Sequence, residues 1–471
     1  MVNENFQWEG EFNLEKLLHR FEKMMKSSVN AYFDAEEFEM LIDYYQSNFN
    51  HEAAKSALQF ALEMHPHNHR LRLQFAKQLA ADGHYMRAIE LLNEIEKAEP
   101  EDADIFMAKG SVYSMMLDFS KAVSEYEKAL AMVDEDEIED LYSTIAFEYE
   151  NLGSFDKALS YLFKALEITA SPDQVLYEIG MCYEMANEID QALKFYLDYI
   201  EKHPANIAAW FNLGLAFHHQ EKYEKAIDAF EYVLAIDDSY VPAYINIGQG
   251  YAALEEYEKA LEAFHESEIY EEAEAITLYY IGECHEKMQD YDKALQFYNT
   301  ALERDEFLPD AWAGIGVIKD ELGDPDKGIY YLEKALELDG LNTEFHLIIA
   351  DLYIKTKRYE KAKEHFQRIE ELDPQDPDLW KEYSYMYIVM GETGKAVQVL
   401  KTGLIHQPAN AGLIYRLAAA LILNKNVSQA YLYLETALEL DYEGYAELFE
   451  FMPSLRQNPR VTELILLHMP Q

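Results

Sequence analysis

Cysteine is nearly absent from this chain, since only Cys182 and Cys284 occur in 471 residues. Two cysteines cannot supply the disulfide framework of a small secreted fold, and so low a content is typical of a reducing compartment. The chain also lacks the run of about 20 apolar residues that a membrane-spanning helix requires. Its first residues, MVNENFQWEGEFNLEK, lack the basic start and apolar run of an export signal. We therefore expect a cytoplasmic protein.

Positive charge is scarce as well. The sequence holds 39 Lys and Arg against 88 Asp and Glu, which gives a formal net charge of -49 at pH 7. A field of this sign repels phosphate backbones and anionic membrane surfaces, and it attracts basic molecules. We expect a basic protein or peptide as the partner, no direct binding of nucleic acid and no membrane insertion. The alternative is that the acidic surface only keeps a long protein soluble.

Motifs for catalysis and metal binding are missing too. The chain contains no glycine-rich phosphate loop, no G-x-S-x-G nucleophile elbow and no H-E-x-x-H zinc helix. His65, His67 and His69 could converge on one ion only in an extended segment, and no cysteine or carboxylate stands beside them at ligand spacing. We expect a protein that is not an enzyme and that holds neither a cofactor nor a metal.

A repeating pattern of 34 residues occupies most of the chain instead. In residues 207–240, Trp210, Gly214 and Phe217 recur at helical spacing. After a short polar turn, Tyr223 opens a second amphipathic pattern. This spacing predicts a helical hairpin.

Steps of 34 residues from Ile207 locate the starts of twelve repeats, which together cover residues 35–444. These starts are Ala35, His69, Ala103, Glu139, Asp173, Ile207, Val241, Ala275, Pro309, Thr343, Pro377 and Ala411. One interval, from Ala103 to Glu139, is 36 residues long, so two residues are inserted within the acidic stretch 134–140. We interpret that stretch as a solvated turn, and the alternative is an acidic docking point for a basic peptide.

Small side chains recur at two positions of the repeat. Position 20 holds Ala54, Ala88, Ala122, Ala158, Ala192, Ala226, Ala260, Ala294, Gly328, Ala362, Ala396 and Ala430. Position 8 holds alanine, glycine or serine in every repeat but the first, which has Ile42. Glycine within a helix costs about 1 kcal/mol relative to alanine, so its recurrence indicates that the two helices pack closely. We expect the large side chains at position 11, such as Tyr149, to be their partners, and the repeat from Pro309 departs with Lys319 there.

The W-x2-L-G-x2-F opening of residues 210–217 and the later Ala226 resemble the tetratricopeptide repeat. The resemblance covers residues 35–444, and it implies an all-α fold, a right-handed superhelical α-solenoid of stacked helix-turn-helix repeats. It also implies that the chain binds other proteins. Since one repeat cannot bury its apolar face alone, both ends of the stack need a cap.

Two segments outside the repeats are expected to supply these caps. In residues 1–34, an acidic stretch precedes an amphipathic helix over residues 13–27, for which the alternative is a partner-binding arm. Its apolar face is expected to hold Leu14, Leu17, Leu18, Phe21 and Met25. Residues 445–471 are expected to form capping helices. The helix from Pro459 is expected to bury Leu464, Ile465 and Leu467.

The resemblance also implies where a partner would bind, because positions 2, 5, 6, 9, 12 and 13 of such repeats line the concave surface. The expected partner-binding residues are Phe147, Glu150, Tyr177, Glu178, Phe211, Asn212, Asn246, Tyr279, Tyr280, Glu283, Glu286, Asp320, Lys381, Tyr385, Tyr415 and Arg416. Carboxylates among aromatic rings suit Lys and Arg side chains. The C-terminal end is more apolar, with Lys381 and Arg416 as local cations, and it suits an apolar segment that ends in a carboxylate.

We therefore predict a protein-protein interaction scaffold or adaptor that binds a basic peptide or protein in the concave groove of its repeats. One alternative is a targeting subunit that presents substrates to a separately encoded enzyme. The other is a structural solenoid that assembles with its own copies into a homo-oligomer, because an uncapped end can stack on another end.

Overall fold

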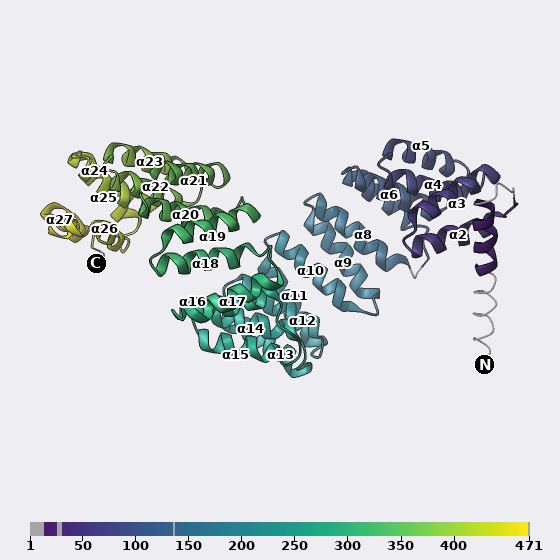
Figure 1. Cartoon of the computed structure of the whole chain (residues 1–471), viewed down its shortest axis with the longest axis horizontal. Coiled ribbons are helices and arrows are strands. Elements are labelled where there is room, and N and C mark those ends of the chain that lie inside the picture. The colour runs from purple at the N-terminus through teal and green to yellow at the C-terminus, as the bar shows by residue number, and fades with distance from the viewer. Residues whose placement is uncertain (1–13, 26–30, 135–136, 470–471) are drawn as a thin grey trace. The chain divides into compact units, whose positions relative to one another are not determined.

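The computed structural model describes residues 14–25, 31–134 and 137–469. The acidic stretch expected before residue 13 and part of the inserted turn, residues 135–136, lie outside them. The described residues contain helices and connecting turns, and they form no strand. The chain divides into two compact units, Met1–Asp238 and Ser239–Gln471. Within each, successive helices pair as hairpins that stack on their neighbours (Figure 1).

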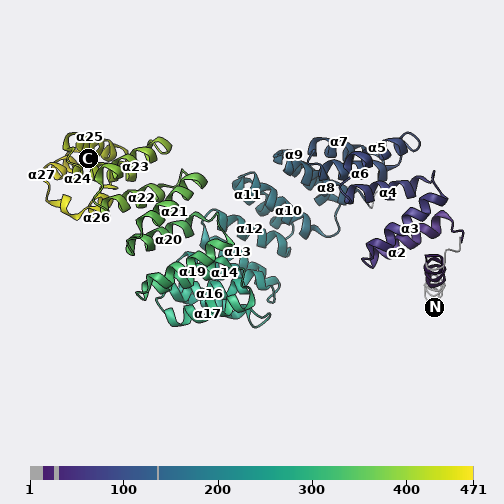
Figure 2. The ribbon, with the colours of Figure 1, turned by 45° about the horizontal axis from the view of Figure 1, so that its top comes forward.

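In the first unit, the helix of residues 14–25 precedes the hairpins. The first helices of the hairpins are α2 (Ala35–Ser47), α4 (His69–Ala81), α6 (Ala103–Met115), α8 (Ile138–Asn151), α10 (Pro172–Met185) and α12 (Ile207–His219). The second helices are α3 (His51–Met64), α5 (Tyr85–Glu96), α7 (Phe119–Ala129), α9 (Phe155–Ile168), α11 (Ile189–Lys202) and α13 (Tyr223–Ile236). Figure 2 shows these pairs from another side.

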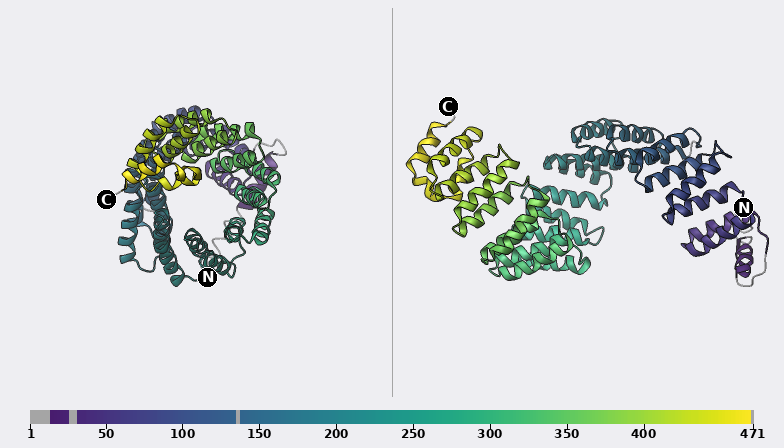
Figure 3. Two further views of the ribbon diagram at one scale, coloured as in Figure 1. Left: turned by 90° about the vertical axis from the view of Figure 1, so that its left-hand side faces the viewer. Right: turned by 90° about the horizontal axis from the view of Figure 1, so that it is seen from above.

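The second unit continues the same pattern, as the views in Figure 3 also show. Its first helices are α14 (Val241–Ala253), α16 (Ala275–Lys287), α18 (Pro309–Glu321), α20 (Thr343–Lys355), α22 (Pro377–Val389) and α24 (Ala411–Leu423). Its second helices are α15 (Tyr257–Ser267), α17 (Tyr291–Arg304), α19 (Pro325–Leu338), α21 (Tyr359–Leu372), α23 (Thr393–His406) and α25 (Val427–Leu440). It closes with α26 (Tyr445–Phe451), the 3-10 helix η2 (Pro453–Gln457) and α27 (Pro459–Leu467). The expected all-α solenoid of helical hairpins is confirmed.

Local signals in the sequence start the helices and turn the chain between them. Many first helices begin with an Asp or Asn cap: the Asn206 side chain, for example, accepts a hydrogen bond of 2.7 Å from the backbone N-H of Ala209. Such a cap satisfies a backbone donor that has no partner within the helix. Between the two helices, one residue takes a left-handed conformation, such as Glu221 with φ 56° and Gly323 with φ 82°. That conformation ends the first helix and lets the chain reverse.

The small residues at position 8 do allow close packing, but their large partners differ from those expected. A Cβ on Gly214 would lie 2.5 Å from the ring of Phe230, and one on Gly248 would lie 2.5 Å from the ring of Phe264. Both rings stand at position 24, on the second helix of the same hairpin. The expectation that position 11 supplies the partner is therefore wrong for these glycines.

The aromatic rings at position 11 have a different neighbour. In several hairpins the ammonium group of a lysine at position 19 lies between 5.0 and 5.6 Å from the ring centroid. The pairs are Lys121 with Tyr113, Lys157 with Tyr149, Lys225 with Phe217, Lys259 with Tyr251, Lys361 with Tyr353, and Lys395 with Tyr387. Each is a cation-π contact that joins the two helices of one hairpin.

The hairpin of α18 and α19 lacks that contact and packs through glycine instead. A Cβ on Gly328 would lie 2.9 Å from the carbonyl oxygen of Gly316 and 2.6 Å from Cδ2 of Leu352. The departure from alanine at this position thus has a packing reason, because a methyl group would push against both α18 and the following repeat.

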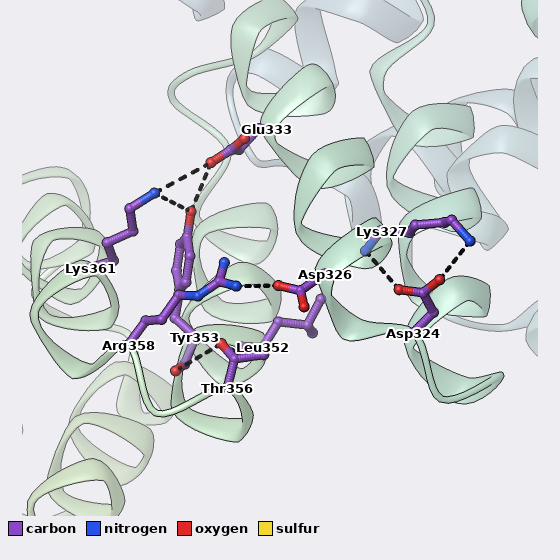
Figure 4. A network of polar contacts seen from close by, with 9 residues as sticks. All are labelled: Asp324, Asp326, Lys327, Glu333, Leu352, Tyr353, Thr356, Arg358 and Lys361. Atoms are coloured by element: carbon purple, nitrogen blue, oxygen red, sulfur yellow. Dashed lines mark hydrogen bonds and ion pairs between the residues drawn. The ribbon is translucent and has the colours of Figure 1, made fainter.

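Polar contacts join the same hairpin to the next one (Figure 4). The Tyr353 hydroxyl on α20 donates a hydrogen bond of 2.8 Å to Glu333 on α19, and Lys361 on α21 lies 3.9 Å from the same carboxylate. Arg358 forms an ion pair with Asp326 at the start of α19. These contacts couple neighbouring repeats along the stack, as a solenoid requires.

The N-terminal helix packs against α2 and α3. Phe21 is buried, and its ring centroid lies 5.8 Å from that of Phe33 and 6.3 Å from that of Phe38. The helix therefore shares one apolar cluster with the first hairpin. The expected apolar face is wrong at one residue, since Met25 is 46% exposed and Met24 is buried in its place.

At the other end, α27 packs against α25 and η2. Leu464 and Ile465 are buried as expected, but Leu467 is 68% exposed. The expectation for Leu467, the last residue of α27, is therefore wrong.

Candidate partner-binding surfaces

A cavity of about 500 Å³ opens between the first helices α16, α18, α20 and α22 of the second unit. Its polar lining is mostly acidic, with Glu283, Glu286, Asp310, Asp320, Glu321, Glu344, Asp351 and Glu382 against Lys287 and Lys355. It is hereafter called the acidic cavity. It brings together four of the expected site residues, namely Tyr279, Glu283, Glu286 and Asp320.

The repeat itself places these side chains. Tyr279, Glu283 and Glu286 recur at spacings of four and three residues, so they share one face of α16. The equivalent face of α18 carries Asp320, and that of α20 carries Asp351. Stacking of the first helices then converts faces of separate helices into one acidic surface.

Several carboxyl groups of this cavity, Glu283 and Glu286 among them, are partly buried and lie near other carboxyl groups. Burial raises the pKa of Glu283, and the neighbouring Glu286 and Asp310 raise it further, against the effect of Lys287. Burial also raises the pKa of Glu286, although the Tyr298 hydroxyl donates a hydrogen bond of 2.7 Å to its Oε2. A raised carboxyl pKa means that the ionised form is destabilised, and a nearby cation would relieve this.

One of the two lysines that line the acidic cavity forms ion pairs with its carboxylates. Lys355 Nζ lies 2.7 Å from Asp320 Oδ2 and 2.8 Å from Asp351 Oδ2. Burial opposes the charge on Lys355, but its hydrogen bonds to the two carboxylates outweigh burial and raise its pKa. Two carboxylates of the acidic cavity therefore bind the ammonium group of Lys355.

An aromatic wall borders the carboxylates. The ring of Tyr279 stacks on that of Tyr298, with 5.7 Å between the centroids and 23° between the planes. Tyr298 is 1% exposed and Tyr279 is half-buried, so the partly exposed ring of Tyr279 packs on the buried ring of Tyr298. An aromatic face beside carboxylates can hold a Lys or Arg side chain through both charge and cation-π contact.

The expected residues of the first unit form a different surface. Phe147 on α8 and Tyr177 on α10 are 58% and 48% exposed. Glu150 and Glu178 are half-buried beside them, and burial together with the charge of Glu178 raises the pKa of Glu150. Phe211 on α12 is also half-buried and packs on its own hairpin.

Two expected site residues are buried, and the expectation that they face a partner is wrong. Asn212 is 6% exposed, and its Nδ2 donates a hydrogen bond of 2.8 Å to the Ala208 carbonyl within α12. Tyr415 is 1% exposed because its hydroxyl donates a hydrogen bond of 2.6 Å to the Asp441 carbonyl. Both side chains are therefore too deeply buried to contact a partner.

The cations expected near the C-terminal end are engaged within the chain. Lys381 Nζ lies 3.0 Å from Asp378 Oδ1. Arg416 lies 3.9 Å from Glu382 Oε1, with its guanidinium 4.3 Å from the centroid of Phe451. These contacts weaken the case for a bound carboxylate there, although Tyr385 is 39% exposed nearby on α22.

The last two expected residues are absent from the lining of the acidic cavity. Asn246 on α14 is half-buried and donates a hydrogen bond of 2.8 Å to the Pro242 carbonyl of its own helix. Tyr280 stacks on Phe264, with 6.0 Å between the centroids.

Exposed methionines were missing from the expected site. Met181 and Met185 on α10 are 42% and 53% exposed. They stand at positions 9 and 13 of the repeat from Asp173, so the rule that selected the other residues also selects them. Methionine at helical spacing is more often part of a core, which is why composition alone does not single them out.

Other chemistry has little support in the described part of the chain. Among residues 14–25, 31–134 and 137–469, no three His, Cys, Asp or Glu side chains are grouped to hold a metal ion. His65 donates a hydrogen bond of 2.8 Å to the Phe33 carbonyl, and Cys182 and Cys284 are free and buried. In these same residues, every helix is too short or too polar to cross a bilayer.

The repeated helical hairpins have counterparts among known proteins. Models described as tetratricopeptide repeat match residues 46–112, 139–172, 174–206, 207–240, 243–306, 274–340 and 321–381, which together make up more than half of the chain. The general transcriptional corepressor ssn6 of Schizosaccharomyces pombe is 28% identical over 124 residues, which are 26% of this chain and 11% of that protein.

Solved structures are similar in their helical repeats. The APC/C hetero-tetramer Cut9-Hcn1 matches with a TM-score of 0.45 and 17% identity, over 89% of this chain and 97% of that one. A tetratricopeptide repeat protein from Parabacteroides merdae matches with a TM-score of 0.45 and 14% identity, over 53% and 98% of the two chains. MamA matches with a TM-score of 0.32 and 22% identity, over 34% and 95%. From the matched models and the stacked hairpins, the chain belongs to the tetratricopeptide repeat family.

Proposed function

We propose that this chain is a protein-interaction scaffold whose acidic cavity binds Lys or Arg side chains of a partner protein. The observation that carries the proposal is the convergence of carboxylates from four first helices on one cavity of about 500 Å³. A groove of this composition favours a basic peptide over an acidic or purely apolar one.

The electrostatics of the cavity support a cationic partner. Burial raises the pKa of Glu283, Glu286, Asp310 and Glu382. A bound guanidinium would stabilise the ionised carboxylates, so binding and ionisation favour each other. Arginine is the better match, since its planar fork can bond two carboxylates and also stack on Tyr279.

Charge reversal within the cavity tests the proposal. We expect a Glu283→Lys/Glu344→Lys variant to bind a short fluorescent peptide of Gly, Ser and Arg at least about tenfold more weakly than the unaltered chain. Glu286 is left in place because it accepts the hydrogen bond of the buried Tyr298. Fluorescence anisotropy measures the affinity, and a thermal melt verifies that the variant is folded.

A matched control separates the cavity from the overall charge. Glu258 on α15 and Glu303 on α17 are exposed residues of the same unit, and they lie outside the cavity lining. A Glu258→Lys/Glu303→Lys variant changes the net charge by the same amount and should bind nearly as tightly as the unaltered chain. Equal losses in the two variants would mean that the general acidic field attracts the peptide, and the cavity would not be the site.

A further inference from the structure

The exposed face of α10 is apolar over about two turns. Tyr177, Met181 and Met185 are 48%, 42% and 53% exposed. Residues four apart lie on the same side of a helix, so the three side chains form one row. At 1.5 Å per residue, the row is about 12 Å long.

A fourth exposed apolar side chain lies on α8. Phe147 is 58% exposed and lies one turn before Glu150 on the same helix face. Burial raises the pKa of Glu150, and the charge of Glu178, which follows Tyr177 on α10, raises it further. Tyr177, Met181 and Met185 are called the methionine-aromatic row.

Carboxylates border the methionine-aromatic row. Glu150 and Glu178 are half-buried between α8 and α10, and Glu184 is exposed on α10 next to Met185. The Nε2 atom of His219 on α12 lies 3.5 Å from Glu184 Oε2. An apolar strip with a charged rim is the usual form of a protein-binding surface.

We infer that the methionine-aromatic row binds the apolar face of an amphipathic helix that carries Lys or Arg on its flanks. The apolar side chains of such a helix recur at three and four residues, which matches the spacing along α10. Its basic flanks would meet Glu150, Glu178 and Glu184. Methionine suits this role because its unbranched side chain adapts to the shape of its partner.

The inference concerns a site other than the acidic cavity, which lies in the second unit, and it does not depend on that cavity. An anionic membrane is disfavoured as the occupant because the same carboxylates would repel it. A second copy of this chain is the other candidate, and the experiment distinguishes it.

The experiment uses the full chain and a designed peptide. The probe is a fluorescent helix with Leu at three- and four-residue spacing and Lys on both flanks, and its control has the same composition in an order that destroys the apolar face. We expect Met181→Ala/Met185→Ala to weaken binding of the helix about tenfold, because anchors at the centre of an interface carry most of its free energy. The scrambled peptide should bind weakly to every variant.

Two further variants make the result specific. Ile168→Ala/Leu197→Ala removes two exposed apolar side chains from α9 and α11, each 51% exposed, and should leave the affinity unchanged. Glu283→Lys/Glu344→Lys should also bind the helix as the unaltered chain does. Equal affinity for all variants, or equal affinity for the two peptides, would overturn the inference. A self-association that Met181→Ala/Met185→Ala abolishes would assign the row to a second copy instead.

Discussion

The first helices of the two units carry different chemistry at equivalent positions. At position 5, α10 and α16 both have tyrosine, Tyr177 and Tyr279. At position 9, α10 has Met181 where α16 has Glu283. Met181 is exposed, and Glu283 is half-buried in the lining of the acidic cavity. The repeat fold constrains positions 8 and 20 and leaves position 9 free, so partner chemistry can vary there without changing the fold.

The surroundings of these positions differ as well. On α16, Glu283 meets carboxylates from α18 and α20, and together they line a cavity with raised carboxyl pKa values. On α10, Met181 and Met185 stand in one exposed row with only a rim of carboxylates. One surface therefore offers mainly charge, and the other mainly apolar area.

The largest expected effect is that of a substitution that disrupts the helix packing of the first unit. Ala226 is fully buried where α12 and α13 cross, so Ala226→Arg would both overpack the hairpin and bury a charge. We expect a cost on the order of 3 kcal/mol or more, and separate melting of two blocks of the array. Calorimetry or circular dichroism would detect the second transition. Glu224→Arg, at an exposed position of the same helix, is the control, and one unchanged cooperative melt for Ala226→Arg would contradict the prediction.

Salt should have a smaller effect, and it should weaken binding at the acidic cavity more than binding at the methionine-aromatic row. Between about 0.01 M and about 0.15 M ionic strength, the screening length falls from about 30 Å to about 8 Å. We expect the arginine peptide to lose about tenfold in affinity over this range, since its binding depends on charge. The amphipathic helix should lose less, because burial of apolar area supplies part of its binding free energy. Parallel losses in anisotropy titrations would mean that both surfaces act through charge alone.

The smallest expected effect is that of pH. As the pH falls from about 7 towards about 5, carboxyls of raised pKa such as Glu283 take up protons first. A bound cation lowers their pKa again, so binding releases protons and the affinity for the arginine peptide should fall several-fold on acidification. Titration calorimetry in buffers of different ionisation enthalpy would detect the released protons, and an affinity that rises on acidification would contradict the scheme.

The same raised pKa values should have the opposite effect on the free energy of unfolding. A carboxyl that binds its proton more tightly in the folded chain than in the unfolded chain adds to the free energy of unfolding as the pH falls through the interval between its two pKa values. Acidification should therefore stabilise the cavity while it weakens the binding of a basic peptide.

The fold and the family could be predicted because packing leaves a periodic trace in the sequence. Two helices that touch at Ala226 need a small side chain there, and the same need recurs in every hairpin. The sequence did not reveal that Phe230, at position 24, is the ring that requires Gly214. One-dimensional spacing identifies small positions, but it does not show which large side chain of the second helix reaches them.

The candidate site could be predicted only in part. The position rule selects Glu283 and Asp320, and the structure brings both into one cavity. The same rule selects Tyr415, which is buried because the end of the following helix covers it and accepts its hydrogen bond. A position rule derived from an average repeat does not take into account a neighbouring segment that buries one particular side chain. The expectation for Leu467 came from the apolar pattern of the capping helix, and that pattern does not show that the last residue of α27 is exposed.

One cross-titration tests the central claim most directly. The arginine peptide and the amphipathic helix are each titrated against the unaltered chain, Glu283→Lys/Glu344→Lys and Met181→Ala/Met185→Ala. We predict that the first variant loses the arginine peptide and keeps the helix, and that the second variant does the reverse. If the first variant keeps the arginine peptide with unchanged affinity, the acidic cavity is not the binding site and the proposed function is wrong.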